Sequence, residues 1–273
     1  MLRSNQIEDS VEAVVAAGIR EVEEDLLAVN PSRETIRALV ETARDVESPP
    51  AVRLLAAEGP VKGVMDDFLV ASVAADLVEE GSLAIRTVEA VPRNSLFVSE
   101  ASVGALVTAG PRVAALTTTA GEFVSTAGDY YDDLWADADD YGLRTPAIST
   151  VRTSLGADIG EEAAADFDAI LESLDSARGN GEGLDEVTIS LLVAARNDEL
   201  LYDISKWGED VGLASKATFS RTKTRLEDTG LLDTEKVPID VGRPRLRLKL
   251  GDDRLADADI DELPSVAHRL LAA

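Results

Sequence analysis

The residues best suited to chemistry in this chain are basic, and they gather between Leu213 and Leu250. The whole chain has 26 basic and 52 acidic residues, a net charge of −26. Residues 213–250 hold 9 basic and 5 acidic residues, so the remainder holds 17 and 47 and carries a net charge of −30. Lys and Arg are the side chains that bind phosphate, so this segment is suited to a polyanion such as double-stranded DNA.

The candidate contacts lie on one predicted helix and one predicted strand. The first residues of a recognition helix meet base edges in the major groove, where Arg can bind guanine with two hydrogen bonds. Alternation along 243–250 places Arg and Lys on one strand face and Pro and Leu on the other. The candidate DNA-binding residues are Ser215, Lys216, Ala217, Thr218, Ser220, Arg221, Lys223, Arg225, Arg243, Arg245 and Arg247.

The elements that must position these residues follow the plan of a winged helix-turn-helix domain. Helical patterns cover 184–197, 200–213 and 215–230, and strand patterns cover 231–239 and 243–250. Ser215 is the expected N-cap of the third helix, and Gly230 is its expected C-terminal stop. Phe219 and Leu226 lie two helical turns apart, so both can pack on the first two helices. A solvated Arg-rich helix and hairpin, or a helix-turn-helix that contacts only protein, would give the same pattern.

Residues 1–142 indicate an α/β domain. The order is helix, strand, helix, strand, helix, then four strands read as a meander, then a final acidic helix. Ser32 and Thr35 resemble a capping box, with Thr in place of the usual Glu. The predicted elements are 7–22, 25–32, 32–45, 51–59, 60–81, 83–91, 94–100, 103–110, 112–120 and 122–142.

Little in the chain suggests catalysis. There is no cysteine, and the single histidine is His268. The acidic pairs Asp66–Asp67, Asp132–Asp133 and Asp139–Asp140 could bind a metal, but such pairs are expected by chance in so acidic a surface, and neighbouring helical residues face different ways. No nucleotide-binding glycine motif and no Cys/His metal spacing is present. We expect no enzyme activity, no metal and no cofactor.

Two features of the N-terminal part could bind a small molecule. Arg93 and Asn94 lie in a turn between two predicted strands, where they could hold a sugar phosphate or simply form the turn. Tyr130, Tyr131 and Trp135 cluster on a predicted helix. Packing on the sheet explains these aromatic residues, and an effector pocket or a dimer face is the alternative.

The acidity spreads along the whole chain and resembles that of proteins from halophilic archaea. Molar salt shortens the Debye length to about 3 Å and screens the repulsion among carboxylates. No run of about 18 apolar residues is present, and the first residues are too acidic for a signal peptide. We therefore expect a soluble, cytoplasmic protein with no membrane partner.

The stretch LASKATFSRTKTRLEDTGLL, with GRPR after it, resembles the winged-helix transcriptional regulators of archaea. The stretch at 77–110 and the helix after it look like the phospholipase-D-like sensor domain of TrmB-type regulators. The whole arrangement is most similar to the haloarchaeal TbsP-type regulators, which implies sugar-dependent control of metabolic genes. TrmB-type regulators carry the DNA-binding domain at the N-terminus, whereas here it is C-terminal.

One residue departs from the pattern of these regulators. Lys223 stands where they usually have an apolar core residue. Its stem could lie along the core with the ammonium in water, as Lys side chains do at such boundaries. Alternatively the helix is rotated, and the base-contacting residues change with it.

The sequence thus predicts four parts: an α/β sensor domain with a mixed sheet and flanking helices (1–142), a helical linker or dimerisation segment (143–183), a winged helix-turn-helix domain (184–250) and an acidic tail with a short helix (251–273). The helix at 161–177 is the expected dimer contact. The predicted function is a homodimeric, metabolite-responsive DNA-binding regulator, with repression favoured over activation. The alternative is an interaction module that sequesters a protein partner without binding DNA.

Overall fold

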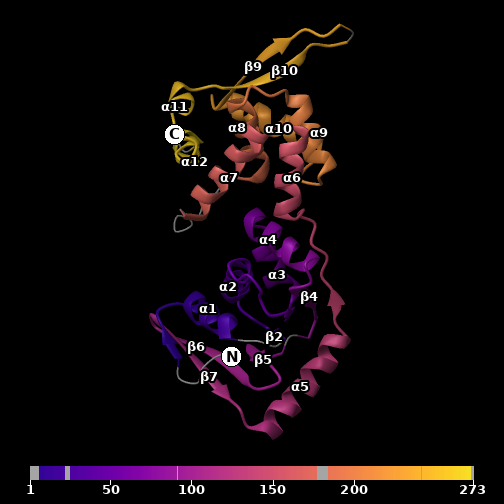
Figure 1. Cartoon of the computed structure of the whole chain (residues 1–273), viewed down its shortest axis with the longest axis vertical. Coiled ribbons are helices and arrows are strands. Elements are labelled where there is room, and N and C mark those ends of the chain that lie inside the picture. Colours follow the sequence, from indigo (N-terminus) through magenta and orange to yellow (C-terminus); the bar gives the residue numbers. More distant parts are fainter. Residues whose placement is uncertain (1–5, 22–24, 91, 177–183, 241, 272–273) are drawn as a thin grey trace. The chain divides into compact units, whose positions relative to one another are not determined.

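The computed structural model describes residues 6–21, 25–90, 92–176, 184–240 and 242–271. The chain divides into two compact units, Met1–Ala147 and Ile148–Ala273 (Figure 1). No helix in the described ranges is long and apolar enough to cross a membrane.

An eight-stranded mixed sheet forms the first unit, in the order β1-β7-β6-β5-β2-β3-β4-β8. The central strands β2, β3 and β4 are parallel, and every other pairing is antiparallel. The strands are β1 Gln6–Glu8, β2 Leu26–Val29, β3 Val52–Ala56, β4 Leu83–Thr87, β5 Leu96–Val98, β6 Val103–Ala109, β7 Arg112–Thr118 and β8 Asp139–Asp140.

Helices cover both faces at the centre of this sheet. On one face α5 (Gly121–Ala136) packs on Leu27, Val29 and Leu55. The alternate strand residues Ala28 and Leu54 are buried too, beneath the helices that connect the parallel strands. Helices α2 Arg33–Arg44, α3 Glu58–Met65 and α4 Phe68–Glu79 make these connections, and α1 Val11–Glu21, between β1 and β2, packs against α2. The predicted α/β class with a mixed sheet is therefore confirmed.

Two details of the predicted order are wrong. The single helix expected at 60–81 is two helices, because α3 ends at its C-cap Asp66 and the next residue, Asp67, is the N-cap of α4. The four strands expected as one meander divide as well. β4 pairs in parallel with β3, and only β5, β6 and β7 follow one another as antiparallel neighbours.

The second unit is a helical domain with a two-stranded wing. Its helix-turn-helix core buries Ile189, Ile204, Phe219 and Leu226. Strand β10 pairs with β9 and also meets Leu200 through an isolated bridge. The elements are α6 Ile148–Asp158, α7 Glu161–Ser176, α8 Glu186–Arg196, α9 Leu201–Asp210, α10 Lys216–Asp228, β9 Leu232–Val237, β10 Arg245–Leu250, α11 Asp253–Ala256 and α12 Leu263–Leu271.

Helices α6 and α7 of the predicted linker, and α11 and α12 of the predicted tail, belong to this second unit. The sequence prediction for 143–183 lacked α6, and α7 packs against α6, α8 and α12. The apolar stripe of α7, with Phe167 and Ile170 fully buried, therefore packs inside the unit. In the segment 251–273, Leu255 and Leu263 are fully buried.

Candidate nucleic-acid interface

The helix α10 begins and ends where its capping residues place it. The Ser215 hydroxyl accepts a hydrogen bond from the backbone N–H of Thr218 at 3.2 Å, which satisfies one of the free donors of the first turn. At the other end Gly230 adopts a φ of 74°, a left-handed conformation that glycine takes without strain. Both predicted caps are present.

The rotation of α10 is fixed by its buried face. Phe219, Lys223 and Leu226 point into the domain. The opposite face presents Ala217, Ser220, Arg221 and Thr224, all exposed and spaced three or four residues apart. Thr224 is absent from the residues predicted from sequence, although its position one turn after Ser220 and Arg221 places it on the same face.

Lys223 is buried and does not reach this outward face. Its side chain is 11% exposed, and its ammonium donates to Glu227 Oε2 at 2.6 Å. Glu227 also accepts a hydrogen bond from the Thr234 hydroxyl of β9 at 2.9 Å. The aliphatic stem of Lys223 therefore lies along the core, as the first of the two explanations from sequence proposed. The ammonium, however, binds the Glu227 carboxylate instead of water. We therefore leave Lys223 out of the interface.

The turn between α9 and α10 depends on a glycine that sequence reasoning missed. A Cβ at Gly208 would lie 2.3 Å from the Phe219 ring, so the two helices meet at a distance that only glycine permits. The backbone N–H groups of Leu213 and Ala214 both donate to the Gly208 carbonyl, at 2.8 and 3.2 Å. A glycine inside a helical pattern, opposite an aromatic residue of the next helix, was the available signal.

Two basic residues of α10 are held by acids from other helices. The Lys216 ammonium lies 2.7 Å from Glu209 of α9. Their hydrogen bond raises the pKa of Lys216 and lowers the pKa of Glu209. The Arg225 guanidinium donates to Asp185 at 3.2 Å and to the Thr188 hydroxyl at 3.1 Å.

The basic residues of β10 contact the start of α9 and the connection that precedes it. Arg245 lies over the Tyr202 ring, 4.3 Å from its centroid, and its guanidinium is 3.4 Å from Asp203. Lys249 donates to Asp198 at 2.6 Å. The Nε of Arg247 is buried and has no hydrogen-bond partner in the structure. Arg245 and Lys249 are therefore partly neutralised within the unit.

Three cations of the segment remain exposed and form no ion pair within the described ranges: Arg221 on α10, Lys236 on β9 and Arg243 at the tip of the wing. Lys236 was not in the predicted set. The positive charge available to a ligand thus lies on the outward face of α10 and on the wing.

The candidate effector residues, Arg93 and Asn94, are exposed in the bend between β4 and β5. This bend is tied to the end of β2, where the Asn30 side chain donates to the Pro92 carbonyl at 2.9 Å. Asn30 itself has a φ of 45°, an uncommon conformation for a residue other than glycine. The carboxyl ends of parallel strands are where α/β sheets place ligands.

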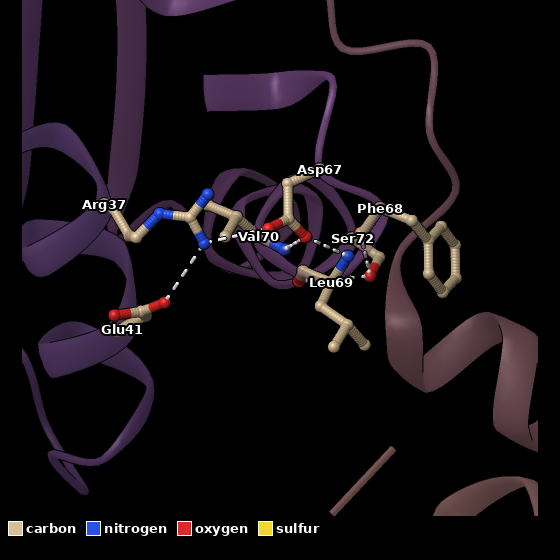
Figure 2. Close-up of polar contacts among 7 residues, drawn as sticks. All are labelled: Arg37, Glu41, Asp67, Phe68, Leu69, Val70 and Ser72. Carbon is tan, nitrogen blue, oxygen red and sulfur yellow. Dashed lines mark hydrogen bonds and ion pairs between the residues drawn. The ribbon is translucent and has the colours of Figure 1, made fainter. Parts of the chain in front are cut away.

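The acidic pairs serve the fold. Asp67 caps α4 by accepting from the backbone N–H groups of Leu69 and Val70, and its other oxygen lies 2.9 Å from Arg37, which also approaches Glu41 (Figure 2). Asp132 and Asp140 bind Arg53 and Arg86, each at 2.8 Å. The described residues include no group of three or more acidic or histidine side chains that could hold a metal.

The aromatic cluster packs on the sheet. Tyr131 is buried among the apolar residues beneath α5, and burial raises the pKa of its hydroxyl. Trp135 lies against the guanidinium groups of Arg53 and Arg86, 5.7 and 5.0 Å from the ring centroid. Tyr130 remains 62% exposed.

Comparison with known proteins adds the family. Residues 3–146 match the model described as "Transcriptional regulator TbsP-like, N-terminal", and residues 147–268 match the model of the corresponding C-terminal HTH domain. The chain belongs to the TbsP-like transcriptional regulators. The two matches meet between residues 146 and 147, next to the division between the two units. This TbsP-like chain thus belongs to a family of transcriptional regulators and has a C-terminal helix-turn-helix domain.

Among solved structures, the TbsP-like chain is similar to TrmBL2, an archaeal chromatin protein whose structure was reported to show a novel mode of DNA binding. The TM-score is 0.36 at 8% identity, over 51% of this chain. The chain spans only 55% of the TrmBL2 chain. No curated protein matches it.

Proposed function

We propose that this TbsP-like regulator binds a palindromic operator as a homodimer and represses genes of sugar or central carbon metabolism in response to a metabolite. The observation that carries the DNA-binding part is the outward face of α10. Ala217, Ser220, Arg221 and Thr224 form an exposed surface with hydrogen-bonding groups, a small side chain and one cation. This surface has the size and chemistry of a helix that reads the major groove.

The electrostatics of the domain support the same proposal. Against a formal charge of −26, Arg221, Lys236 and Arg243 stay exposed without an acidic partner in the described part of the chain. They lie on two elements, the recognition helix and the wing, that a winged domain places against the same duplex. In our proposal Ser215, Lys216, Thr218, Arg225, Arg245 and Arg247 contribute to phosphate contacts around this centre.

Mobility-shift titration tests the proposal. The full chain would be titrated against the promoter regions of its own genome and against a scrambled duplex, at several salt concentrations. We expect specific shifts whose affinity falls as salt rises, because phosphate contacts release counterions. Equal affinity for all duplexes would contradict the proposal that the protein recognises a specific sequence. No shift at any salt concentration would favour the alternative, a module that sequesters a protein partner.

For the sensor role, we propose that Arg93 and Asn94 bind an anionic effector such as a sugar phosphate at the carboxyl end of β2. Their exposure, and the bond between Asn30 and Pro92 that holds the bend in place, support this site. A thermal-shift screen with sugars and sugar phosphates should show stabilisation that Arg93→Ala removes. Arg112→Ala is the matched control, because Arg112 is an exposed arginine paired with Asp9 elsewhere on the sheet. No stabilisation at millimolar ligand would contradict the sensor role. In the cell, the proposed location is the cytoplasm, where the operator lies.

A further inference from the structure

One face of the sheet in the first unit is apolar and only half covered. Helix α5 packs on Val98 and Val103, on the side of β5 and β6 that it faces. Side chains alternate along a strand, so Val107 projects from the same side as Val103. The pairing of β6 with β7, and of β7 with β1, puts Leu116 and Ile7 on this side as well. Val107, Leu116 and Ile7 are 44, 52 and 57% exposed.

The flank of α5 extends this apolar surface. Asp132 binds Arg53 of β3, so the Asp132 flank of the helix lies toward β3. With 100° of rotation per residue, Phe123 and Tyr130 lie on the opposite flank, toward β5 and β6. Both are large and open to solvent, at 53 and 62% exposure. The helix and the uncovered strands therefore form a ledge with an apolar floor and an apolar wall.

This surface, made by Ile7, Val107, Leu116, Phe123 and Tyr130, is here called the β6–β7 face. It contains five of the nine large apolar residues that are exposed within the described ranges. The seven-residue strands β6 and β7 are each roughly 23 Å long and together span roughly 10 Å, so this part of the sheet measures about 200 Å² before the rings of Phe123 and Tyr130 are added. The largest apolar patch on a soluble protein is often functional.

Charge identifies the kind of partner. Residues 101–121, which form β6 and β7, contain no Asp or Glu and one basic residue, Arg112. In a chain with 52 acidic residues among 273, a run of 21 would carry about four by chance, so this face is unusual for its lack of carboxylates. Arg112 is itself paired with Asp9 at 2.8 Å. Strands β6 and β7 therefore offer no carboxylate and no unpaired cation as a countercharge to a nucleic acid or to a charged peptide.

We propose that the β6–β7 face binds the same face of a second copy of this chain. Elsewhere two copies, each with a charge of −26, would bring carboxylates together, whereas here apolar side chains meet apolar side chains. A two-fold interface uses one patch twice, which suits a flat, uncharged sheet face. The other expected contact, α7, has its apolar stripe buried within its own unit. The inference rests on the homodimer of the proposed function and gives it a location.

The test measures the mass of the full chain in solution. Val107→Glu with Leu116→Glu places two carboxylates on the floor of the face, and Val78→Glu is the matched control at an exposed apolar residue of α4. Sedimentation equilibrium and light scattering should give a dimer for the wild type and the control, and a monomer for the double variant. We expect its dimer dissociation constant to rise at least about 100-fold, because burying unpaired carboxylates is costly.

Circular dichroism checks that the variant is folded. If the glutamates prevent folding, Val107→Thr with Leu116→Ser makes the same face polar with side chains that strands tolerate. The mass of this second double variant in solution then tests the proposal. A monomeric wild type at micromolar concentration would overturn the proposal, and so would a double variant that remains dimeric, as expected if another part of the chain covers the face. DNA binding is measured separately. A wild type that dimerises but never binds DNA refutes the proposed function alone.

Discussion

Lys223 donates to Glu227 one turn later on the inner side of the recognition helix, at 2.6 Å, and Glu227 accepts in turn from Thr234 of the wing. The helix α10 and the strand β9 are therefore joined by a buried cation and its carboxylate. The Lys223 ammonium therefore binds inside the domain and does not face solvent. The exposed residues on the outward face of α10 are Ala217, Ser220, Arg221 and Thr224.

This arrangement predicts opposite effects for the two partners. Lys223→Met removes the cation and leaves Glu227, whose side chain is 27% exposed and still accepts from Thr234, so the free energy of unfolding should change by less than about 1 kcal/mol. Glu227→Gln leaves the buried ammonium without its countercharge and should cost roughly 1–3 kcal/mol. Denaturant titration at fixed salt measures both. DNA affinity should be unchanged in Lys223→Met, and a large loss there would return Lys223 to the interface.

Gly208 should tolerate no side chain. In Gly208→Ala the new Cβ meets the Phe219 ring at 2.3 Å, which must push α10 away from α9 and should cost roughly 1–3 kcal/mol. Gly128→Ala is the control, since Gly128 also lies within a helix but has nothing within 4 Å of an added Cβ. The control should raise stability by about 0.5–1 kcal/mol through better helix propensity. Equal effects in thermal unfolding would contradict the close approach.

Arg221 and Arg243 should differ in how they affect DNA binding. Arg221→Ala removes the one cation of the outward face and should lower affinity for the specific site by about 1–3 kcal/mol, with little effect on scrambled DNA. Arg243→Ala, at the wing tip, should weaken binding to all duplexes and reduce the salt slope by about 1. Lys206→Ala is the control, because Lys206 is exposed on α9 and paired with Asp210. If Lys206→Ala lowers the affinity for the specific site as much as Arg221→Ala does, net charge alone determines DNA affinity.

Asp67 should matter for stability and not for metal binding. Asp67→Ala removes the N-cap of α4 and the bond to Arg37 (Figure 2), so it should cost about 1–2 kcal/mol. Asp66→Ala, at the exposed neighbour, should stay within about 0.5 kcal/mol of the wild type. Thermal unfolding with added divalent cation or chelator should be the same for all three proteins. Stabilisation by a divalent cation that Asp67→Ala abolishes would restore the metal interpretation.

Glu186 should give the domain a pH dependence. Burial in the first turn of α8 raises the pKa of the Glu186 carboxyl, and the nearby Asp185 carboxylate adds to the shift. The folded state therefore binds this proton more tightly than the unfolded state does. Stability due to this group should fall as the pH rises from the ordinary value near 4.5 through the raised pKa.

Glu186→Gln removes this titration. The difference in unfolding free energy between Glu186→Gln and the wild type should therefore grow in favour of the variant as the pH rises, and then level off above the raised pKa. Denaturant titration across the acid range measures this difference, and the many other carboxylates cancel in it. A difference that shrinks with rising pH would reverse the sign of the shift.

Local signals allowed the helix-turn-helix and the wing of the second unit to be predicted. The caps at Ser215 and Gly230, the spacing of Phe219 and Leu226, and the alternation in GRPRLRLKL depend on residues within one or two turns of each other. In the first unit one such signal was available but not used, because Asp67 before an apolar run is an N-cap pattern that divides 60–81 into two helices.

The partners of the charged side chains could not be predicted in this way. Asp185 and Arg225 are 40 residues apart, and only the packing of α8 on α10 brings them together. Gly208 is similar, since its role appears only when the Phe219 ring is placed against it. Sequence patterns identify which residues share a face of their own element. The opposing face comes from the tertiary fold.

Three cations of the domain are already paired with carboxylates of the same chain: Lys216 with Glu209, Arg225 with Asp185 and Arg245 with Asp203. A phosphate that takes over such a cation frees a carboxylate, and that carboxylate then gathers a cation from solution. Each exchange therefore binds one cation to the protein while the duplex releases counterions, so fewer ions are released overall. The slope of affinity against salt should therefore count fewer contacts than this regulator makes, and the shortfall should shrink when Glu209, Asp185 or Asp203 is changed to its amide.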